Sequence, residues 1–182
     1  MIQVIDQLGR DHRNMRLLLD IVEAEMAGYR AGQSPDFELL QMIARYMLDY
    51  PDLIHHPKED LVFARLVERD PEARAMLGDL IGDHRRLAQL SQRFAAALAN
   101  ASRDVELPRA WLAALLDQFL QAYREHMEAE ERHFLPRAMA RLTDTDWNEI
   151  DERIAAPADP VFGERQVGSY LRLHERILRL RL

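Results

Sequence analysis

The stretches His55-His56-Pro57-Lys58-Glu59 and His126-Met127-Glu128-Ala129-Glu130 decide how this sequence is interpreted. In each stretch a glutamate lies four residues after a histidine, so both side chains fall on one face of an α-helix, with Cβ atoms about 5–6 Å apart. A histidine and a glutamate placed in this way can bind the same metal ion. The pattern occurs once in each half of the chain and predicts a metal centre at which the two helices meet.

A further histidine precedes each stretch. Asp11-His12-Arg13 comes before the first and Asp83-His84-Arg85 before the second, at nearly the same spacing. A lone buried histidine is usually a hydrogen-bonded core residue, but glutamate is rarely fully buried unless it is paired or binds a metal. The repeated set of four imidazoles and two carboxylates therefore favours a site for two metal ions, with both carboxylates bridging.

Composition narrows the class of protein. The chain has 182 residues, of which 48% are apolar and 30% charged, as in a globular protein of one domain, or of one domain with a short appendage. The net charge of −7 argues against a nucleic-acid-binding surface. There is no cysteine, which excludes disulfides, cysteine nucleophiles and Cys-ligated clusters. Any metal must be held by His, Asp and Glu, which suit iron, manganese or zinc.

Nothing in the sequence indicates export or membrane attachment. No apolar run approaches the roughly 18 residues of a membrane span. Residues 1–6 lack the basic and apolar regions of a signal peptide. We therefore expect a cytoplasmic protein without nucleic-acid or membrane partners.

The residue pattern is helical throughout. Leu, Ala, Glu and Arg dominate and glycine is scarce, as helix propensity favours. Prolines mark several helix starts, because proline is tolerated in the first turn. These features predict an all-α fold, an up-down-up-down four-helix bundle with a C-terminal helical extension. The expected bundle helices cover residues 3–30, 36–69, 71–99 and 108–142.

The C-terminal extension is expected to pack on the outside or the end of the bundle. Thr143 can cap a short helix, residues 156–160 form a loop, and a final helix begins at about Glu164. We therefore divide the chain into a bundle, residues 1–142, and an extension, residues 143–182.

In the repeated histidine and glutamate stretches, the sequence resembles the hemerythrin-like, or HHE cation-binding, family of bacterial type. The resemblance covers roughly residues 5–140. The resemblance implies a pair of non-haem iron ions with a bridging oxo or hydroxo group. It implies six ligands, with the first two histidines on one iron, the last two on the other, and both glutamates bridging. Carried over residue by residue, the implied ligands are His12, His55, Glu59, His84, His126 and Glu130.

Two departures from the family pattern bear on function. Oxygen-carrying members have a second histidine on the third helix, four residues from the first, where this chain offers Leu80 and Ala88. Their fourth helix carries an aspartate five residues after its histidine, whereas Glu130 lies four residues after His126 here. The site therefore resembles the symmetric type of bacterial members linked to nitric oxide, oxygen or iron stress, which argues against reversible oxygen carriage.

Other histidines and acidic residues near these candidates are assigned other roles. His56 points about a quarter-turn away from His55, which favours the surface or a supporting position over a ligand role. His133 is expected to line or flank the core, and His174 to be an ordinary surface or interface residue. Asp60 and Glu131 are expected on a solvated or salt-bridged face. For Asp11 and Asp83, a local hydrogen bond and solvent exposure are equally open.

Aromatic residues and one proline also lie close to the candidate ligands. For Tyr46, Tyr50 and Tyr123, core packing is favoured over a hydrogen bond to a ligand or a bound gas. Pro57 lies inside its helix and is expected to distort it beside the metal site, because proline removes a backbone hydrogen bond.

Three functions fit such a centre. We favour a protein that binds, senses or buffers oxygen, nitric oxide or iron at an open coordination position. The alternative is an oxidoreductase that reduces nitric oxide or peroxide, or assists iron-centre repair. It would need an external electron donor, because the sequence has no flavin or nicotinamide motif. A structural or partner-binding bundle with incidental metal is the third. The physiological metal, the gas and the oligomeric state are left open.

Overall fold

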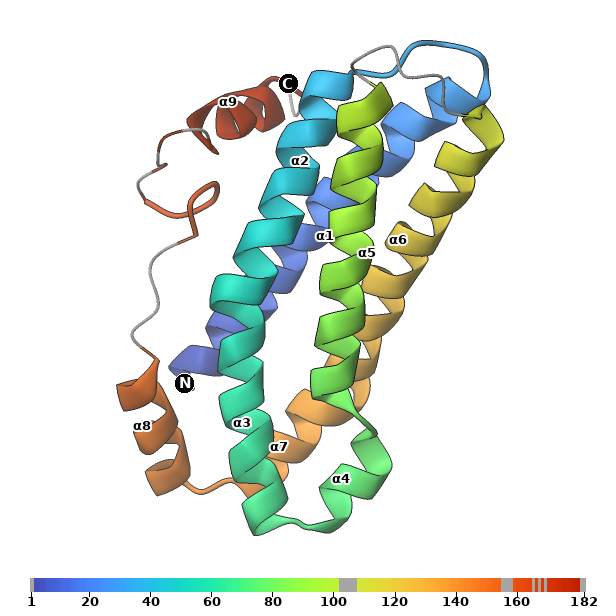
Figure 1. Cartoon of the computed structure of the whole chain (residues 1–182). Coiled ribbons are helices and arrows are strands. Elements are labelled where there is room, and N and C mark those ends of the chain that lie inside the picture. The colour runs from blue at the N-terminus through green and yellow to red at the C-terminus, as the bar shows by residue number, and fades with distance from the viewer. Residues whose placement is uncertain are drawn as a thin grey trace.

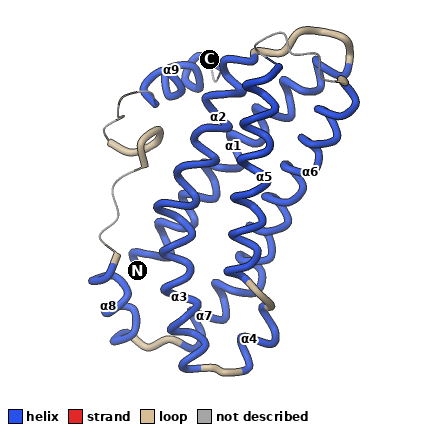
Figure 2. The backbone as a smooth tube through the Cα atoms, viewed as in Figure 1, coloured by secondary structure: helices blue, strands red, loops and turns tan. Residues whose placement is uncertain are grey.

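A computed structural model describes residues 2–101, 108–154, 159–164, 166, 168 and 170–180 of the chain. All regular secondary structure in these residues is helical (Figure 2), so the predicted all-α class is confirmed. None of the helices in this part of the chain is long and apolar enough to cross a membrane.

The long helices lie side by side, and successive segments run in opposite directions (Figure 1). The second and fourth segments each contain a π-helical turn, η1 or η2, between two α-helices. In chain order the segments are α1 (Gln3–Arg30); α2 (Phe37–Tyr50), η1 (Pro51–His55) and α3 (His56–Arg69); α5 (Leu80–Ala101); and α6 (Arg109–Ala129), η2 (Glu130–Phe134) and α7 (Leu135–Arg141).

The predicted helix 71–99 is wrong at its start. The chain forms a short helix, α4 (Glu72–Leu77), and turns before α5 begins. Gly78 has a φ of 70°, which an α-helix excludes and which glycine adopts without a steric penalty. The Asp79 carboxylate then accepts a hydrogen bond of 3.0 Å from the Gly82 N–H, which satisfies a backbone donor left free at the start of α5. This turn sets the beginning of the helix that carries His84.

Both π-helical turns lie at candidate ligands. η1 ends at His55, and η2 begins with Glu130. A proline, Pro57 or Pro136, follows the end of each turn by two residues. Proline within a helix has no N–H to donate and its ring clashes with the carbonyl four residues earlier, and a wider π turn relieves that clash. The distortion expected from Pro57 thus takes the form of a widened turn next to the site.

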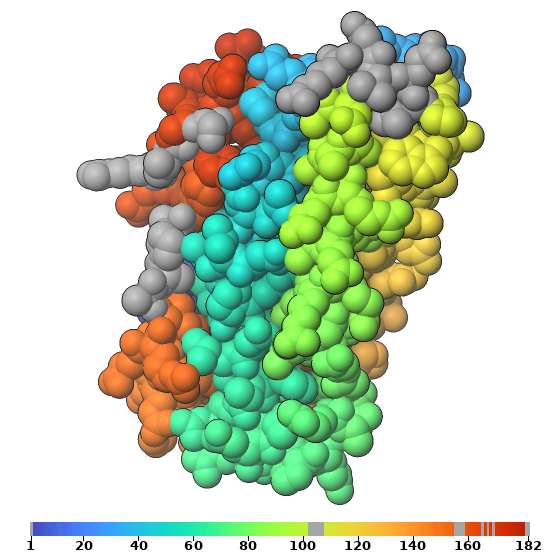
Figure 3. All heavy atoms as spheres, in the orientation of Figure 1, coloured from blue at the N-terminus to red at the C-terminus, as the bar shows by residue number. Residues whose placement is uncertain are grey.

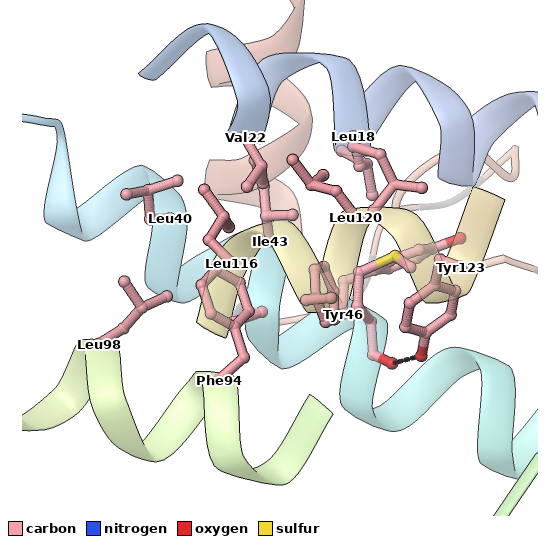
Figure 4. Close-up of a cluster of buried hydrophobic side chains, with 14 of the residues drawn as sticks. Leu18, Val22, Leu40, Ile43, Tyr46, Phe94, Leu98, Leu116, Leu120 and Tyr123 are labelled. Carbon is pink, nitrogen blue, oxygen red and sulfur yellow. Dashed lines mark hydrogen bonds between the residues drawn. The ribbon is translucent and has the colours of Figure 1, made fainter. Parts of the chain in front are cut away.

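Two clusters of buried apolar side chains enclose the layer of candidate ligands. In the larger cluster, side chains of α1, α2, α5 and α6 meet around Phe94 (Figure 4). The smaller cluster contains Val4, Phe63 and Phe134. Along α1, members of the smaller cluster precede His12 and members of the larger cluster follow it. The polar layer therefore lies between two apolar layers, which shield it from water at both ends.

The C-terminal extension lies against the outside of the long helices (Figure 3). α8 (Asp144–Arg153) contacts α1 and α3, and α9 (Tyr170–Leu180) contacts α2. Thr143 caps α8 through a capping box, as its position in the sequence predicts. His174 Nδ1 donates a hydrogen bond of 2.8 Å to the Val161 carbonyl, so this histidine joins two parts of the extension.

The final helix starts later than the sequence indicates. It begins at Tyr170 instead of about Glu164. Gly168 has a φ of 55°, in the left-handed region, which is incompatible with a right-handed helix through this position. Of the predicted loop 156–160, residues 156–158 lie outside the described residues.

Candidate metal centre

The six predicted ligands come together in the layer between the two apolar clusters. Each of the four long segments contributes at least one of them. His126 is half-buried and the other five are at most 6% exposed. The six are His12 on α1, His55 at the end of η1, Glu59 on α3, His84 on α5, His126 on α6 and Glu130 at the start of η2.

His12, His55 and Glu59 form the first group of converging atoms. The Nε2 atoms of the two imidazoles lie 3.1 Å apart. Glu59 Oε1 lies 3.4 Å from His12 Nε2 and 3.3 Å from His55 Nε2. Three donor atoms at this spacing can hold one cation between them.

His84, His126 and Glu130 form the second group. Glu130 Oε1 lies 3.1 Å from His126 Nε2 and 3.5 Å from His84 Nε2. The two imidazole rings meet edge to face, with centroids 5.0 Å apart. This group is the repeat equivalent of the first, built from α5, α6 and η2 instead of α1, η1 and α3.

Each glutamate faces both groups with different oxygen atoms. Glu59 turns Oε1 to the first group, while its Oε2 lies 3.5 Å from His84 Nε2. Glu130 turns Oε1 to the second group, while its Oε2 lies 3.4 Å from His12 Nε2. Two carboxylates that bridge a pair of cations need this arrangement.

Several buried atoms of the layer have no hydrogen-bond partner within the described part of the chain. They are both carboxylate oxygens of Glu59, Oε2 of Glu130 and Nε2 of His126. His126 Nε2 is close to Glu130 Oε1 but is not oriented for a hydrogen bond. An unpaired buried carboxylate oxygen is costly, and a cation held between these atoms would remove the cost. The residues therefore fit a metal site.

The Nδ1 atoms of three imidazoles point away from the centre and bind carboxylates. A carboxylate only accepts hydrogen bonds, so each Nδ1 donates and each Nε2 lone pair is left for the centre. Histidines that bind metals are oriented in this way. The pairs are His12 with Glu131 (3.0 Å), His55 with Asp11 (3.2 Å) and His84 with Asp60 (3.0 Å).

Asp11 is the most connected of these acidic partners. The sequence left open whether Asp11 forms a local hydrogen bond or is exposed to solvent. It is 3% exposed, so solvent exposure is excluded. Besides His55, it accepts hydrogen bonds from the Tyr50 hydroxyl at 2.9 Å and from Lys58 Nζ at 3.4 Å. Burial opposes the charge of Asp11, but His55, Lys58 and Tyr50 together lower its pKa. Its place directly before His12 was the only sequence signal for this role.

The other acidic neighbours lie nearer the surface. Glu131 forms two hydrogen bonds with Arg16, of 2.8 and 2.7 Å, as expected of a salt-bridged face. That Glu131 and Asp60 also orient imidazoles could not be predicted from the sequence. Asp83, the repeat equivalent of Asp11, is half-buried and pairs with Arg86 instead.

The charges of the layer depend on one another. Burial would lower the pKa of His12, but Glu130 and Glu59 outweigh it and raise this pKa to about 10. Burial likewise opposes the charge of His84, whose pKa Asp60 and Glu130 raise to about 9. Burial and Glu130 would raise the pKa of Glu59, but His55 and His12 lower it to about 2. Without metal, the layer therefore holds protons on imidazoles between ionised carboxylates.

Comparison with known proteins agrees with this geometry. The family model of the hemerythrin HHE cation binding domain matches residues 3–138. The chain belongs to this family. The predicted family resemblance is thus confirmed, and the match includes all six converging residues. Comparison with curated proteins and with solved structures found no match.

In this hemerythrin-family chain, His56 is not a surface residue, although a surface position was one of its two favoured assignments. It is 4% exposed, and its ring stacks on that of His84 with centroids 4.0 Å apart and 4° between the planes. His56 Nδ1 lies 3.2 Å from Asp52 Oδ1. Burial outweighs Asp52 and lowers the pKa of His56 to about 4, so its imidazole is neutral.

A cavity of about 460 Å³ adjoins the second group of the hemerythrin-family centre, where α5 and α6 face each other. His126, Glu130 and Leu80 are among the residues that line it. Leu80 is one of the positions at which the oxygen-carrying members would have a second histidine. His133 also lines the cavity, next to the core residue Phe134, but its own side chain is exposed, so it flanks the core and is not part of it.

The three tyrosines near the centre are all buried, in agreement with core packing. Tyr123 donates a hydrogen bond of 3.0 Å to the Met47 carbonyl (Figure 4). Tyr46 stacks on Tyr50, with ring centroids 5.1 Å apart, and its hydroxyl donates to Asp159 Oδ2 at 2.9 Å. Since Tyr50 also bonds to the partner of a candidate ligand, the C-terminal extension is linked to the centre through these two rings.

Proposed function

We propose that this hemerythrin-family chain is a non-haem di-iron protein that binds or senses a small diatomic ligand, oxygen or nitric oxide, or iron itself. The observation that carries the proposal is a pair of buried glutamates, Glu59 and Glu130, whose unpaired oxygens face two separate imidazole groups. The proposed ligands are those that the resemblance implies, with the first group on one iron, the second on the other and both glutamates bridging.

The donor set supports iron as the metal. Imidazole and carboxylate ligands suit iron, manganese and zinc, and the family to which the chain belongs is named for cation binding. A bound iron pair, with a bridging oxo or hydroxo group, supplies an open coordination position for a small ligand. The chain itself orients the imidazoles through acidic partners and excludes bulk water with two apolar clusters.

The cavity beside the second group supports access of a ligand to the centre. It reaches His126 and Glu130, and much of its wall is apolar, with Leu80, Leu87 and Ala122 among the lining residues. Oxygen and nitric oxide are small and weakly polar, so they can pass along this largely apolar wall. We propose this cavity as the route of the diatomic ligand to the centre.

The arrangement of helices supports a finer description of the fold. We propose that residues 1–142 are an up-down-up-down four-helix bundle and that residues 143–182 form a helical extension packed on it. The alternating directions of the long segments and the contacts of α8 and α9 with them support this division. A cytoplasmic location stays a prediction from the sequence.

Gas titration of the iron-loaded protein tests the function. We expect the optical spectrum to change saturably on addition of nitric oxide or oxygen, with no steady consumption of the gas when a reductant is present. Continued consumption of nitric oxide or peroxide with a reductant would instead support the oxidoreductase alternative. An iron-loaded protein whose spectrum does not respond to either gas would contradict ligand binding, and Glu59→Gln serves as the control that lacks one bridging carboxylate.

A further inference from the structure

His56 lies within the polar layer, although the six proposed ligands do not include it. Its side chain is 5% exposed, so it is buried. His56, Glu59, His84 and His126 each offer a ligand atom, and these atoms all lie within 4.8 Å of one another. Ligand atoms on one first-row metal ion lie at most about 4 Å apart, which is twice a bond length of ~2.1 Å, so the group must contract slightly around an ion. Because an imidazole binds a metal in the plane of its ring, the His56 ring must also rotate out of its parallel stack on His84.

The hydrogen bonding of His56 matches that of three candidate ligands, His12, His55 and His84. Its Nδ1 lies 3.2 Å from Asp52 Oδ1, one turn earlier on the same segment. Because the carboxylate accepts, Nδ1 carries the proton and the Nε2 lone pair is available for a metal. Four imidazoles of the layer share this arrangement, with Nδ1 bonded to a carboxylate. The pairs are His12 with Glu131, His55 with Asp11, His56 with Asp52 and His84 with Asp60.

The local backbone explains how two consecutive histidines reach the same layer. Neighbouring residues of an α-helix point roughly 100° apart, so one of a pair usually turns away from a site. His55 ends the π-helical turn η1, and His56 begins α3. The His55 ring lies 4.9 Å from that of His12, in the first group, whereas the His56 ring lies 4.0 Å from that of His84, in the second. The two neighbours therefore serve different groups.

We propose that His56 binds the second metal ion through Nε2, so that this ion is held by three imidazoles and the first ion by two. The proposal rests on the proposed di-iron function. It replaces the symmetric four-imidazole site expected from the sequence with an unequal pair. The additional imidazole comes from α3, whereas Leu80 and Ala88 stand at the third-helix positions where oxygen-carrying family members place it.

The difference between the two irons is measurable without any activity. We expect the Mössbauer spectrum of the wild-type protein loaded with ⁵⁷Fe to contain two quadrupole doublets of equal area, one for each iron. In His56→Phe, which keeps an aromatic ring against His84 but has no nitrogen, we expect the two doublets to converge. A chelator should also remove one of the two irons from His56→Phe faster than from the wild-type protein. We expect this rate to rise by on the order of 10-fold or more.

Two further variants make the comparison specific. His174→Phe removes an imidazole of the extension, outside the polar layer, and should leave the spectrum and the rate of iron loss unchanged. Asp52→Asn keeps the His56 ring but replaces its charged acceptor, and should change the doublet of one iron only. This variant and the wild-type spectrum keep the proposal testable if circular dichroism shows that His56→Phe is unfolded.

The outcomes separate this proposal from the function on which it rests. A wild-type protein that takes up no iron would overturn both. Two bound irons with a single doublet, or with doublets and release rates that His56→Phe and Asp52→Asn leave unchanged, would overturn the role of His56 alone. Two unequal irons that become alike in His56→Phe would establish it.

Discussion

The Nε2 atoms of His12 and His55 lie 3.1 Å apart, while the Nδ1 atom of each ring binds a carboxylate. Because carboxylates only accept, both Nδ1 atoms carry protons, and two neutral imidazoles would oppose their Nε2 lone pairs. A positive charge between the rings, or a proton on one of them, removes this repulsion. The layer is therefore built to hold positive charge, supplied by metal ions or, without them, by protons.

Removing the charge of a bridging carboxylate is expected to affect both metal ions. Glu59 faces the first group through Oε1 and the second through Oε2, so Glu59→Gln should weaken binding of both irons. We expect a loss in affinity of more than about 100-fold, beyond the 10–100-fold typical of residues that only support ligands. Glu128→Gln, which alters an exposed glutamate paired with Arg132, is the matched control. Equal iron content in the two variants, measured after chelator competition, would contradict the bridging role.

Metal binding is expected to release protons. In the metal-free protein the pKa values of His12 and His84 are raised to about 10 and about 9, so both imidazoles are charged near neutral pH. A bound metal displaces these protons, so at least two should be released, and affinity should rise by up to about 100-fold per pH unit. Calorimetry in buffers of different ionisation enthalpy measures the number. Metal binding without proton release would show that these histidines are not ligands.

The stability of the metal-free protein is expected to fall at high pH. The pKa values of His12 and His84 are raised above the ordinary value of 6.5, so their contribution to stability is fully present below pH 6.5 and is lost as pH rises through about 9 to 10. The urea midpoint of the chelator-treated protein should therefore decrease between about pH 7 and about pH 10. The urea midpoint of the iron-loaded protein should decrease less over this pH range. Identical pH profiles with and without metal would contradict the charged-imidazole account.

The buried acidic partner Asp11 can be compared with its repeat equivalent. Asp11 binds His55, Tyr50 and Lys58, whereas Asp83 pairs with Arg86 nearer the surface. We expect Asp11→Asn to lower iron affinity by about 10–100-fold, because it weakens the hydrogen bond that orients an imidazole and leaves a buried lysine poorly paired. Asp83→Asn should change affinity little. If the two variants lose iron to a chelator at the same rate, Asp11 does not orient the site.

Narrowing the cavity is expected to slow the arrival of a gas without changing the metal content. Ala122 is half-buried on α6 and lines the cavity, so Ala122→Phe places a ring in the proposed route. Ala114→Phe, at an exposed position of the same helix, is the control. Stopped-flow mixing with nitric oxide should give a lower association rate for the first variant only. An unchanged rate in Ala122→Phe would show that the ligand enters elsewhere.

Much of the fold follows from local sequence signals. Helical periodicity and the scarcity of glycine predicted the all-α class, and Thr143 marked the start of α8 correctly. The break in the predicted helix 71–99 was missed, because a single glycine does not reveal from the sequence that Gly78 adopts the positive φ that ends α4. The π turns were also missed, since Pro57 indicates a distortion but not its form.

The candidate site was predictable where it follows the repeat and not where it breaks it. The spacing of histidines and glutamates identified six residues that the structure brings together. The sequence could not predict that Asp11 orients an imidazole while Asp83 does not. The difference arises because Asp11 is buried and Asp83 is only half-buried, although their places in the repeat are equivalent. His56 has no equivalent in the second half, where Met127 follows His126, and its inward position depends on the π turn before it. Partners from other helices, such as Glu131 for His12, depend on tertiary packing that spacing does not encode.

The metal content and optical spectrum of the protein isolated in air test the central claim most directly. We expect two irons per chain, with near-ultraviolet absorption from an oxo or hydroxo bridge, and loss of both in Glu59→Gln. Zinc alone, or no metal after expression in iron-rich medium and reconstitution with ferrous iron, would contradict the di-iron account.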